Sequence, residues 1–184
     1  IAKSIFWIKD REGALPDVIG IAEVENRFVL KRLLEDTPLY KTDYEIVHFD
    51  SPDPRGIDVA LLYRLSRLEL LQAVPLRVGG GADPPLRTRD ILLTKFRRQD
   101  GDSVAFLVNH HPSKYGGKTN DRRKMALLRL RNATDSLQNA GLRNIVAMGD
   151  FNDTPDNPAF GILTDGQPYP LLNIAAPLAE RGEG

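Results

Sequence analysis

The sequence contains no cysteine among its 184 residues. Disulfide bonds, thiolate metal sites and cysteine nucleophiles are therefore excluded. Because a cysteine-free chain suits reducing and oxidising compartments alike, the localisation stays open. The sequence also has no apolar run of membrane-spanning length and no stretch with the pattern of a signal peptide. We therefore expect no membrane span.

The sequence has no excess of charge of either sign. Its 25 Lys and Arg residues balance its 25 Asp and Glu residues, so the formal net charge is zero. Without a global basic field, the protein is not expected to coat DNA, whereas an enzyme that contacts a few phosphates in a cleft is compatible with this balance. The length and an apolar content of 41% suit one domain over residues 1–184.

The spacing of apolar residues indicates a mixture of helices and strands. A period of about 3.6 residues predicts helices over 1–13, 26–36 and 120–141, and Asn26 is the expected N-cap of the second helix. Short apolar runs bounded by Gly, Pro and Asp predict strands over 16–23, 44–49, 57–64, 68–76, 89–96, 103–111 and 144–150. This order favours an α/β or α+β protein with a mostly antiparallel or mixed sheet. The Pro-rich tail from Asn157 has no definite pattern.

The stretch IVAMGDFNDTP (145–155) has an unusual concentration of polar residues at the end of an apolar strand. One explanation is a turn, because Asp, Asn and Pro are common turn residues. The other is a functional site, because α/β proteins place their chemistry at the carboxyl ends of buried strands.

Other predicted strands also end in polar residues. Besides Asp150 and Asn152, the strand ends carry Glu23, His110 and Arg64. If these ends converge, their side chains suit a hard cation such as Mg²⁺, which takes one or two protein carboxylates and completes its shell with water and phosphate. His110 or Asp150 would then move a proton, and Asn152 would orient a phosphate oxygen or a water.

Each of these residues also has a purely structural interpretation. Glu23 can be an ordinary strand-end carboxylate, and strand alternation sends only one of His110 and His111 into a given site. The remaining polar residues are better explained without chemistry: His48 as a structural residue, Asp153 and Asp156 as turn residues, and Arg122 and Arg123 as a solvated helix face.

Four motifs stand in the order in which one known superfamily has them. They are PDVIGIAEVEN (16–26), RGIDVALLYR (55–64), VNHHPSKYGG (108–117) and MGDFNDTP (148–155). In these motifs the sequence resembles the endonuclease/exonuclease/phosphatase superfamily, which has the deoxyribonuclease-I-like fold, and it is most similar to bacterial nucleases of that superfamily. Their histidine motif reads Asn-His-Trp-Pro-Ser, so His111 stands in the place of Trp and the resemblance favours His110 as the functional imidazole.

The resemblance implies a fold and a chemistry. The fold would be a four-layered α/β sandwich, with two packed mixed β-sheets and helices outside. The activity would be Mg²⁺- or Mn²⁺-dependent hydrolysis of a phosphate ester by in-line attack of water. Glu23 would ligate the metal, Asp150 and Asn152 would position the nucleophile and the phosphate, and His110 would bind or protonate the phosphate region. Arg64, and less strongly Arg55, would contact phosphate.

Two parts of the family pattern are missing. The family opens with a strand whose Asn helps to hold the metal, and it closes with a strand that carries an Asp-His pair. Here the three histidines, at 48, 110 and 111, all precede Asp150. We therefore expect a domain that lacks the first and last strands. Either residues 1–184 are part of a longer chain, which the intact motifs and the non-Met start favour, or the protein is a truncated relative without hydrolytic power.

Three functions remain open at this stage. The first is a metal-dependent nuclease acting on DNA or RNA, for which basic residues would flank the cleft (Arg97, Arg98, Lys114, Lys118, Arg122 and Arg123). The second is a phosphatase acting on a small phosphorylated molecule or a lipid headgroup. The third is a non-catalytic phosphate-binding module. A monomer is favoured in each case.

Overall fold

Two β-sheets form the centre of the molecule, and helices cover the outer face of each. The computed structural model describes residues 1–79, 86–113, 119–166 and 168–182. The three-stranded sheet has the order β1-β3-β2, and the four-stranded sheet has the order β4-β5-β6-β7. The strands are β1 (Val18–Val24), β2 (Tyr44–His48), β3 (Asp58–Arg64), β4 (Leu68–Leu76), β5 (Ile91–Arg98), β6 (Ser103–His110) and β7 (Asn144–Asp150).

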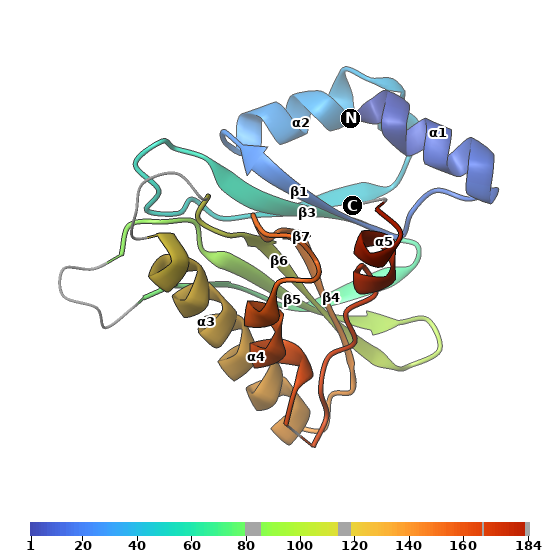
Figure 1. Ribbon diagram of the computed structural model, residues 1–184. Coiled ribbons are helices and arrows are strands. Elements are labelled where there is room, and N and C mark those ends of the chain that lie inside the picture. The colour runs from blue at the N-terminus through green and yellow to red at the C-terminus, as the bar shows by residue number, and fades with distance from the viewer. Residues whose placement is uncertain (80–85, 114–118, 167, 183–184) are drawn as a thin grey trace.

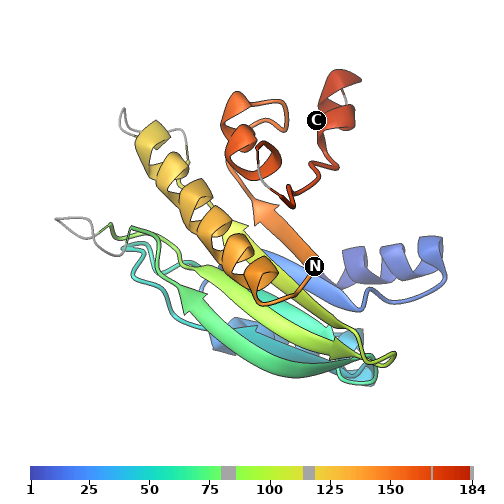
Figure 2. The same cartoon turned by 90° about the horizontal axis from the view of Figure 1, so that it is seen from below.

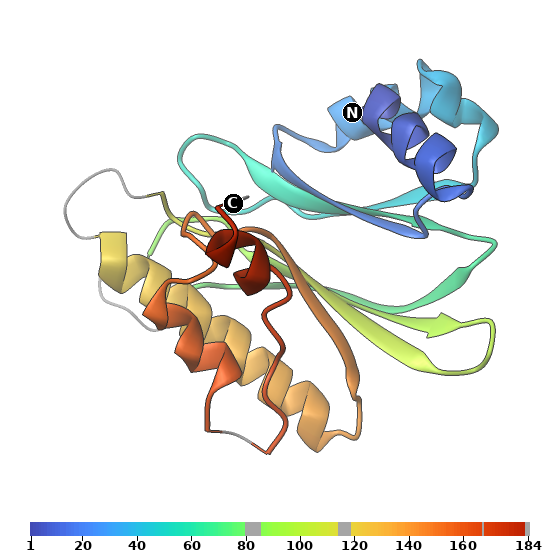
Figure 3. The same cartoon turned by 45° about the vertical axis from the view of Figure 1, so that its right-hand side comes forward.

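The helices complete the four layers that the resemblance implies (Figures 1 and 3). Helices α1 (Ala2–Glu12) and α2 (Arg27–Glu35) cover the three-stranded sheet, whereas α3 (Thr119–Asn139) runs across the outer face of the four-stranded sheet (Figure 2). Shorter helices are η1 (Pro38–Lys41), η2 (Pro158–Phe160), α4 (Gly161–Thr164) and α5 (Ala176–Glu180). In the part of the chain that the structure describes, no helix is long and apolar enough to cross a membrane.

The sequence of β3 is an almost continuous apolar run because both faces of this strand are buried. Its alternate residues Val59, Leu61 and Tyr63 face the core between the two sheets, where the Tyr63 ring lies 4.9 Å from that of Phe96. Its other residues, Ala60 and Leu62, pack against the cores beneath α1 and α2. A central strand covered on both faces loses the apolar–polar alternation of a half-exposed strand.

Most of the expected elements are found within a few residues of their predicted bounds. The expected N-cap is confirmed, because the Asn26 side chain accepts a hydrogen bond of 3.1 Å from the backbone N–H of Val29. We expected both sheets to combine parallel and antiparallel pairs. The three-stranded sheet is antiparallel throughout. The four-stranded sheet is mixed, because β6 and β7 pair in parallel. The tail, which showed no pattern, forms η2, α4 and α5.

The parallel pairing of β6 with β7 determines where the polar strand ends lie. The register runs from Val104 opposite Asn144 to His110 opposite Asp150, so both strands end at the same edge. Gly149 makes this approach possible: its φ is +123°, and a Cβ at this position would lie 2.1 Å from the carbonyl oxygen of Asn109. Any larger residue would push β7 away from β6.

We predict that Gly149→Ala destabilises the protein by more than about 2 kcal/mol, because backbone strain adds to the steric clash with Asn109. The matched control is Gly141→Ala. Gly141 also has a positive φ, +88°, but a Cβ there meets nothing within 4 Å, so the cost should be about 1 kcal/mol. Urea denaturation of both variants measures the difference. Equal losses would show that the close approach at Gly149 is unimportant.

Candidate functional site

His110 and Asp150 form the centre of the candidate site. They end β6 and β7 at paired positions, and His110 Nε2 lies 3.9 Å from Asp150 Oδ2. The His110 side chain is only 4% exposed, whereas that of Asp150 is 52% exposed. A buried imidazole therefore lies beside a carboxylate that solvent and solutes can reach.

Glu23 approaches this pair from the other sheet. The strand β1 lies against both β6 and β7, and the register between β1 and β3 shifts between Ala22 and Val24, which is the signature of a β-bulge at Glu23. Glu23 is exposed and has a φ of +59°. The bulge therefore re-aims a strand-end carboxylate, a known use of such irregularities.

The charged residues around the site all affect the pKa of the His110 imidazole. Burial lowers the pKa of His110, the Arg89 and Arg55 charges lower it further, and Asp150 and Glu23 act in the opposite direction. The ring is therefore neutral at pH 7. Its Nδ1 atom is buried and has no hydrogen-bond partner among the described residues.

Asn152 joins the loop after β7 to the end of β6. Its Nδ2 donates to the carbonyl of His111 at 2.8 Å, and its backbone N–H donates to Asp150 Oδ1 at 2.8 Å. Its φ is +51°, and Glu23 is the other non-glycine residue with a positive φ in the described ranges. Strained backbone of this kind concentrates at functional sites, so both outliers support the predicted site.

The two arginines of the RGIDVALLYR motif lie far apart. Arg55 is held beside the site by Asp53, whose Oδ1 accepts the Arg55 backbone N–H at 3.0 Å, and its side chain is largely exposed. Arg64 does not join the group. Because β1 and β3 are antiparallel, Arg64 lies at the opposite end of the sheet from Glu23, where it binds Asp43 at 2.7 Å. This corrects the expectation that all four strand ends converge.

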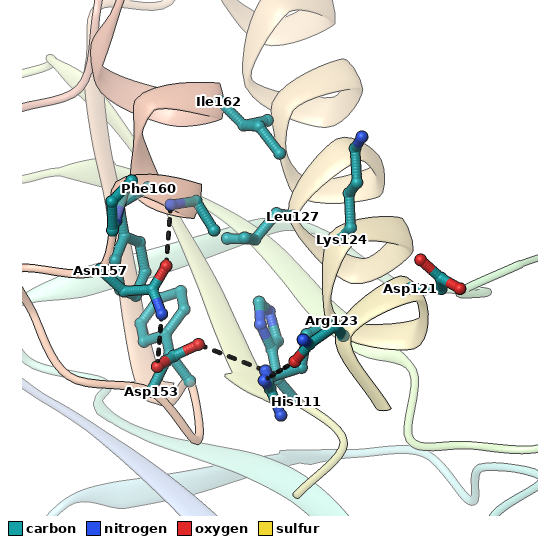
Figure 4. A pocket seen from close by; sticks show the side chains of 13 residues that line it. His111, Asp121, Arg123, Lys124, Leu127, Asp153, Asn157, Phe160 and Ile162 are labelled. Atoms are coloured by element: carbon teal, nitrogen blue, oxygen red, sulfur yellow. Dashed lines mark hydrogen bonds and ion pairs between the residues drawn. The ribbon is translucent and has the colours of Figure 1, made fainter. Parts of the chain in front are cut away.

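His111 faces a separate pocket of about 480 Å³ between α3 and the loop after β7. Its ring packs edge-on against Phe151 with centroids 4.9 Å apart, as expected for a residue in the place of Trp. Burial lowers the pKa of His111 to about 4, so this wall of the pocket is uncharged at neutral pH. Phe160 and Ile162 line the pocket from one side and Leu127 from α3 (Figure 4).

Arg123, which we interpreted as part of a solvated helix face, is instead buried against Asp153, whose side chain also accepts from the Thr154 backbone as a turn residue does. Arg123 is buried, and its Nε lies 3.3 Å from Asp153 Oδ2 across the end of the pocket (Figure 4). Asp153 Oδ1 also accepts from Asn157 Nδ2 at 2.8 Å. This buried ion pair fastens the loop after β7 to the first turns of α3.

Two of the six basic residues expected to flank a nucleic-acid cleft lie elsewhere. Arg97 and Arg98 end β5 opposite the start of β6, so they lie at the far end of the sheet from His110. They are paired there with Glu69 at 2.8 Å and Asp100 at 2.7 Å. Lys114 and Lys118 lie outside the described residues.

Sequence reasoning missed Arg89 and Asp53, which are buried directly behind the site. Arg89 Nη1 donates to Asp53 Oδ2 at 2.7 Å. Asp53 stands in a Pro- and Gly-containing loop that reads as surface, whereas Arg89 begins the predicted strand 89–96, where no local pattern marks it as a site residue. Their burial depends on partners 21 to 36 residues away, and a single sequence carries no signal for such contacts.

The oxygen donors of the site suit a hard cation. Glu23 and Asp150 provide carboxylates, and Asn152 provides an amide, at one edge of the molecule. Mg²⁺ requires few protein ligands of this type. A second group, His48, Asp50 and Asp58, has ligand atoms within 4.8 Å of one another. There, however, buried His48 and Asp58 already bind each other at 3.1 Å, which supports the structural interpretation of His48.

Comparison with solved structures shows the same fold in other proteins, two of which are described as phosphatases. The catalytic domain of human Nocturnin with bound sulfate matches with a TM-score of 0.62 and 20% identity, over 79% of this chain and 56% of that one. ANGEL2, a 2′,3′-cyclic phosphatase, matches at 0.70 and 19%, over 90% and 47%. A mannosyl-6-phosphatase from Bacteroides thetaiotaomicron matches at 0.63 and 17%, over 86% and 59%. The chain thus spans about half the length of these proteins.

No curated protein sequence matches the chain. A family model does match, and it covers residues 1–184 with the description Endonuclease/Exonuclease/phosphatase family. The two stacked sheets, the polar edge at His110 and Asp150, and this match agree. The chain belongs to the endonuclease/exonuclease/phosphatase family.

Proposed function

We propose that the protein hydrolyses phosphate esters with Mg²⁺ or Mn²⁺, and that phosphodiesters of DNA or RNA are its first candidate substrates. The observation that carries this proposal is that His110 and Asp150 are neighbours at one edge, with Glu23 near enough to act electrostatically on His110 and Asn152 fastened to the same edge. Membership of the family supports hydrolysis of phosphoesters in general.

Glu23 would hold the metal, with Asp150 beside it. When bound, the metal would neutralise charge on the phosphate and lower the pKa of water. Asp150, exposed and next to an imidazole, would orient the attacking water. Neutral His110 can exchange hydrogen bonds with a phosphate oxygen, and the exposed guanidinium of Arg55 can bind a second one. Water attacks phosphorus and gives up a proton as the bond to the leaving oxygen breaks, and the leaving oxygen takes up a proton, so that one water is consumed for each ester cleaved.

A phosphatase acting on a small phosphorylated molecule is the second candidate. It is favoured by the position of Arg97 and Arg98, which are paired with acidic residues at the far end of the sheet. Extended nucleic acid binding normally relies on several free Lys or Arg residues. The 480 Å³ pocket beside the site is also of a size that suits the organic part of a small substrate.

We predict that Glu23→Gln weakens Mn²⁺ binding by at least about tenfold without loss of stability, because Glu23 is exposed. The substitution removes the charge and keeps the shape. Isothermal titration with Mn²⁺ measures the affinity, and thermal unfolding measures the stability. Glu25→Gln, two residues away and also exposed, is the control. Equal affinities in both variants would remove Glu23 from the metal site.

Turnover should fall by at least about 100-fold in Asp150→Asn with folding intact, because the new amide oxygen can still accept from the Asn152 backbone. Plasmid DNA, RNA and bis(p-nitrophenyl) phosphate would be offered with Mg²⁺, Mn²⁺ or EDTA. The natural chain that contains residues 1–184 would be used at its full length, with Asp156→Asn as the control. Metal-dependent turnover that survives in Asp150→Asn refutes its role. No turnover with any substrate supports the binding module.

The salt dependence of substrate affinity separates the two candidate activities. A nucleic-acid substrate whose phosphates bind Z basic groups should lose affinity with a logarithmic slope of about −0.9Z for duplex DNA. A small phosphorylated molecule should show a much shallower slope. Measuring KM between low and physiological salt with DNA, RNA and a sugar phosphate decides between them, and a flat profile for nucleic acid would contradict the nuclease assignment.

A further inference from the structure

Arg89 lies immediately before β5, behind the candidate site, and all three of its guanidinium nitrogens are engaged. It is 6% exposed. Nε donates to the carbonyl of His110 at 3.2 Å, Nη2 donates to the carbonyl of His111 at 2.8 Å, and Nη1 donates to Asp53 Oδ2 at 2.7 Å. One side chain therefore connects β5, the end of β6 and the loop between β2 and β3.

Asp53 extends this connection to Arg55. While Oδ2 accepts from Arg89, Oδ1 accepts the backbone N–H of Arg55 at 3.0 Å. Burial alone would raise the pKa of Asp53, but hydrogen bonds from the Arg55 backbone and from Arg89 outweigh burial and hold the pKa below its usual range. The pair is therefore ionised at neutral pH.

The carbonyl of His111 is a junction between β6 and the loop after β7. It accepts from Arg89 Nη2 and also from Asn152 Nδ2, each at 2.8 Å. The backbone N–H of His111 donates to the carbonyl of Asp150 at 2.8 Å. A shift of this peptide would displace the candidate residues on both strands.

We propose that Arg89 is a positioning residue of the site: with Asp53, it fixes the His110–His111 backbone and the Arg55 loop relative to each other. This inference rests on the proposed hydrolytic function, because the residues that Arg89 positions are those to which we assign the chemistry. Arginine suits this task and lysine does not, since only a planar guanidinium presents several N–H donors in a rigid fork.

A merely structural ion pair would also be buried, so the experiment needs a matched control. Arg131 provides it. Arg131 is 6% exposed, its Nη1 donates to the carbonyl of Leu163 at 3.2 Å, and its Nη2 lies 2.7 Å from Asp135 Oδ1. It joins α3 to α4, and its loss should also cost stability, because it leaves the buried carbonyl of Leu163 without this donor, although Asp135 is 35% exposed and Asp53 is not.

Arg89→Met and Arg131→Met should be compared at a temperature at which both are folded. We expect amide exchange at His111 and Asn152, measured by NMR, to accelerate at least about tenfold in Arg89→Met and to stay at the wild-type rate in Arg131→Met. With the substrate found for the wild type, kcat should fall by about 100-fold in Arg89→Met, with a smaller change in KM. Arg131→Met should keep kcat within about twofold of the wild-type value.

Arg89→Lys keeps the charge with a smaller structural change, and it serves if the Met variant does not fold. It should show the same two effects at reduced size. Combining either substitution with Asp53→Asn should add less than the sum of the single effects, because both act through one unit. Unchanged exchange at His111 and Asn152, or an equal loss of kcat in Arg131→Met, would overturn the proposal. If the wild type hydrolyses nothing, the hydrolytic function fails, and the exchange rates alone still test the positioning role.

Discussion

The close parallel pairing of β6 and β7 is the constraint on which the site depends. It requires Gly149, whose missing side chain lets the two backbones approach at Asn109. Because the strands run in register to their last residues, His110 and Asp150 end side by side. The adjacent His111 contributes to a pocket lined from α3 and the loop after β7. The end of β6 therefore contributes to two places: His110 lies at the charged edge, and His111 lines a largely apolar pocket.

Buried ion pairs hold the loops around this edge together with apolar contacts such as that of Phe151 with Phe160. Arg89 with Asp53 fastens the loop that carries Arg55, and Arg123 with Asp153 fastens the loop after β7. Such pairs add little net stability because the desolvation of both charges offsets their attraction. Their directional hydrogen bonds, however, select one loop geometry, which apolar packing does less well. The site thus lies on loops that are constrained at specific backbone atoms.

Local patterns predicted the elements and most of the strand-end residues, and they failed where pairing direction or distant contacts decide. A strand end is visible in sequence, but the edge at which it lies is not: antiparallel pairing sends Arg64 away from Glu23. Arg89 begins a predicted strand, but no local pattern shows its role, since its partners come from two distant segments, 110–111 and the loop that contains Asp53. Arg123 could have been recognised as buried, because it precedes Leu127 and Leu130 at helical spacing on the buried face of α3.

The positive φ angles at Glu23 and Asn152 lower the stability of the protein at two positions of the candidate site. A left-handed conformation costs a non-glycine residue about 1–2 kcal/mol, and glycine adopts it without that cost. Glycine at either position would relax the backbone and remove the functional side chain in one step. Selection for thermal stability alone would therefore favour glycine at both positions, at the cost of two candidate site side chains.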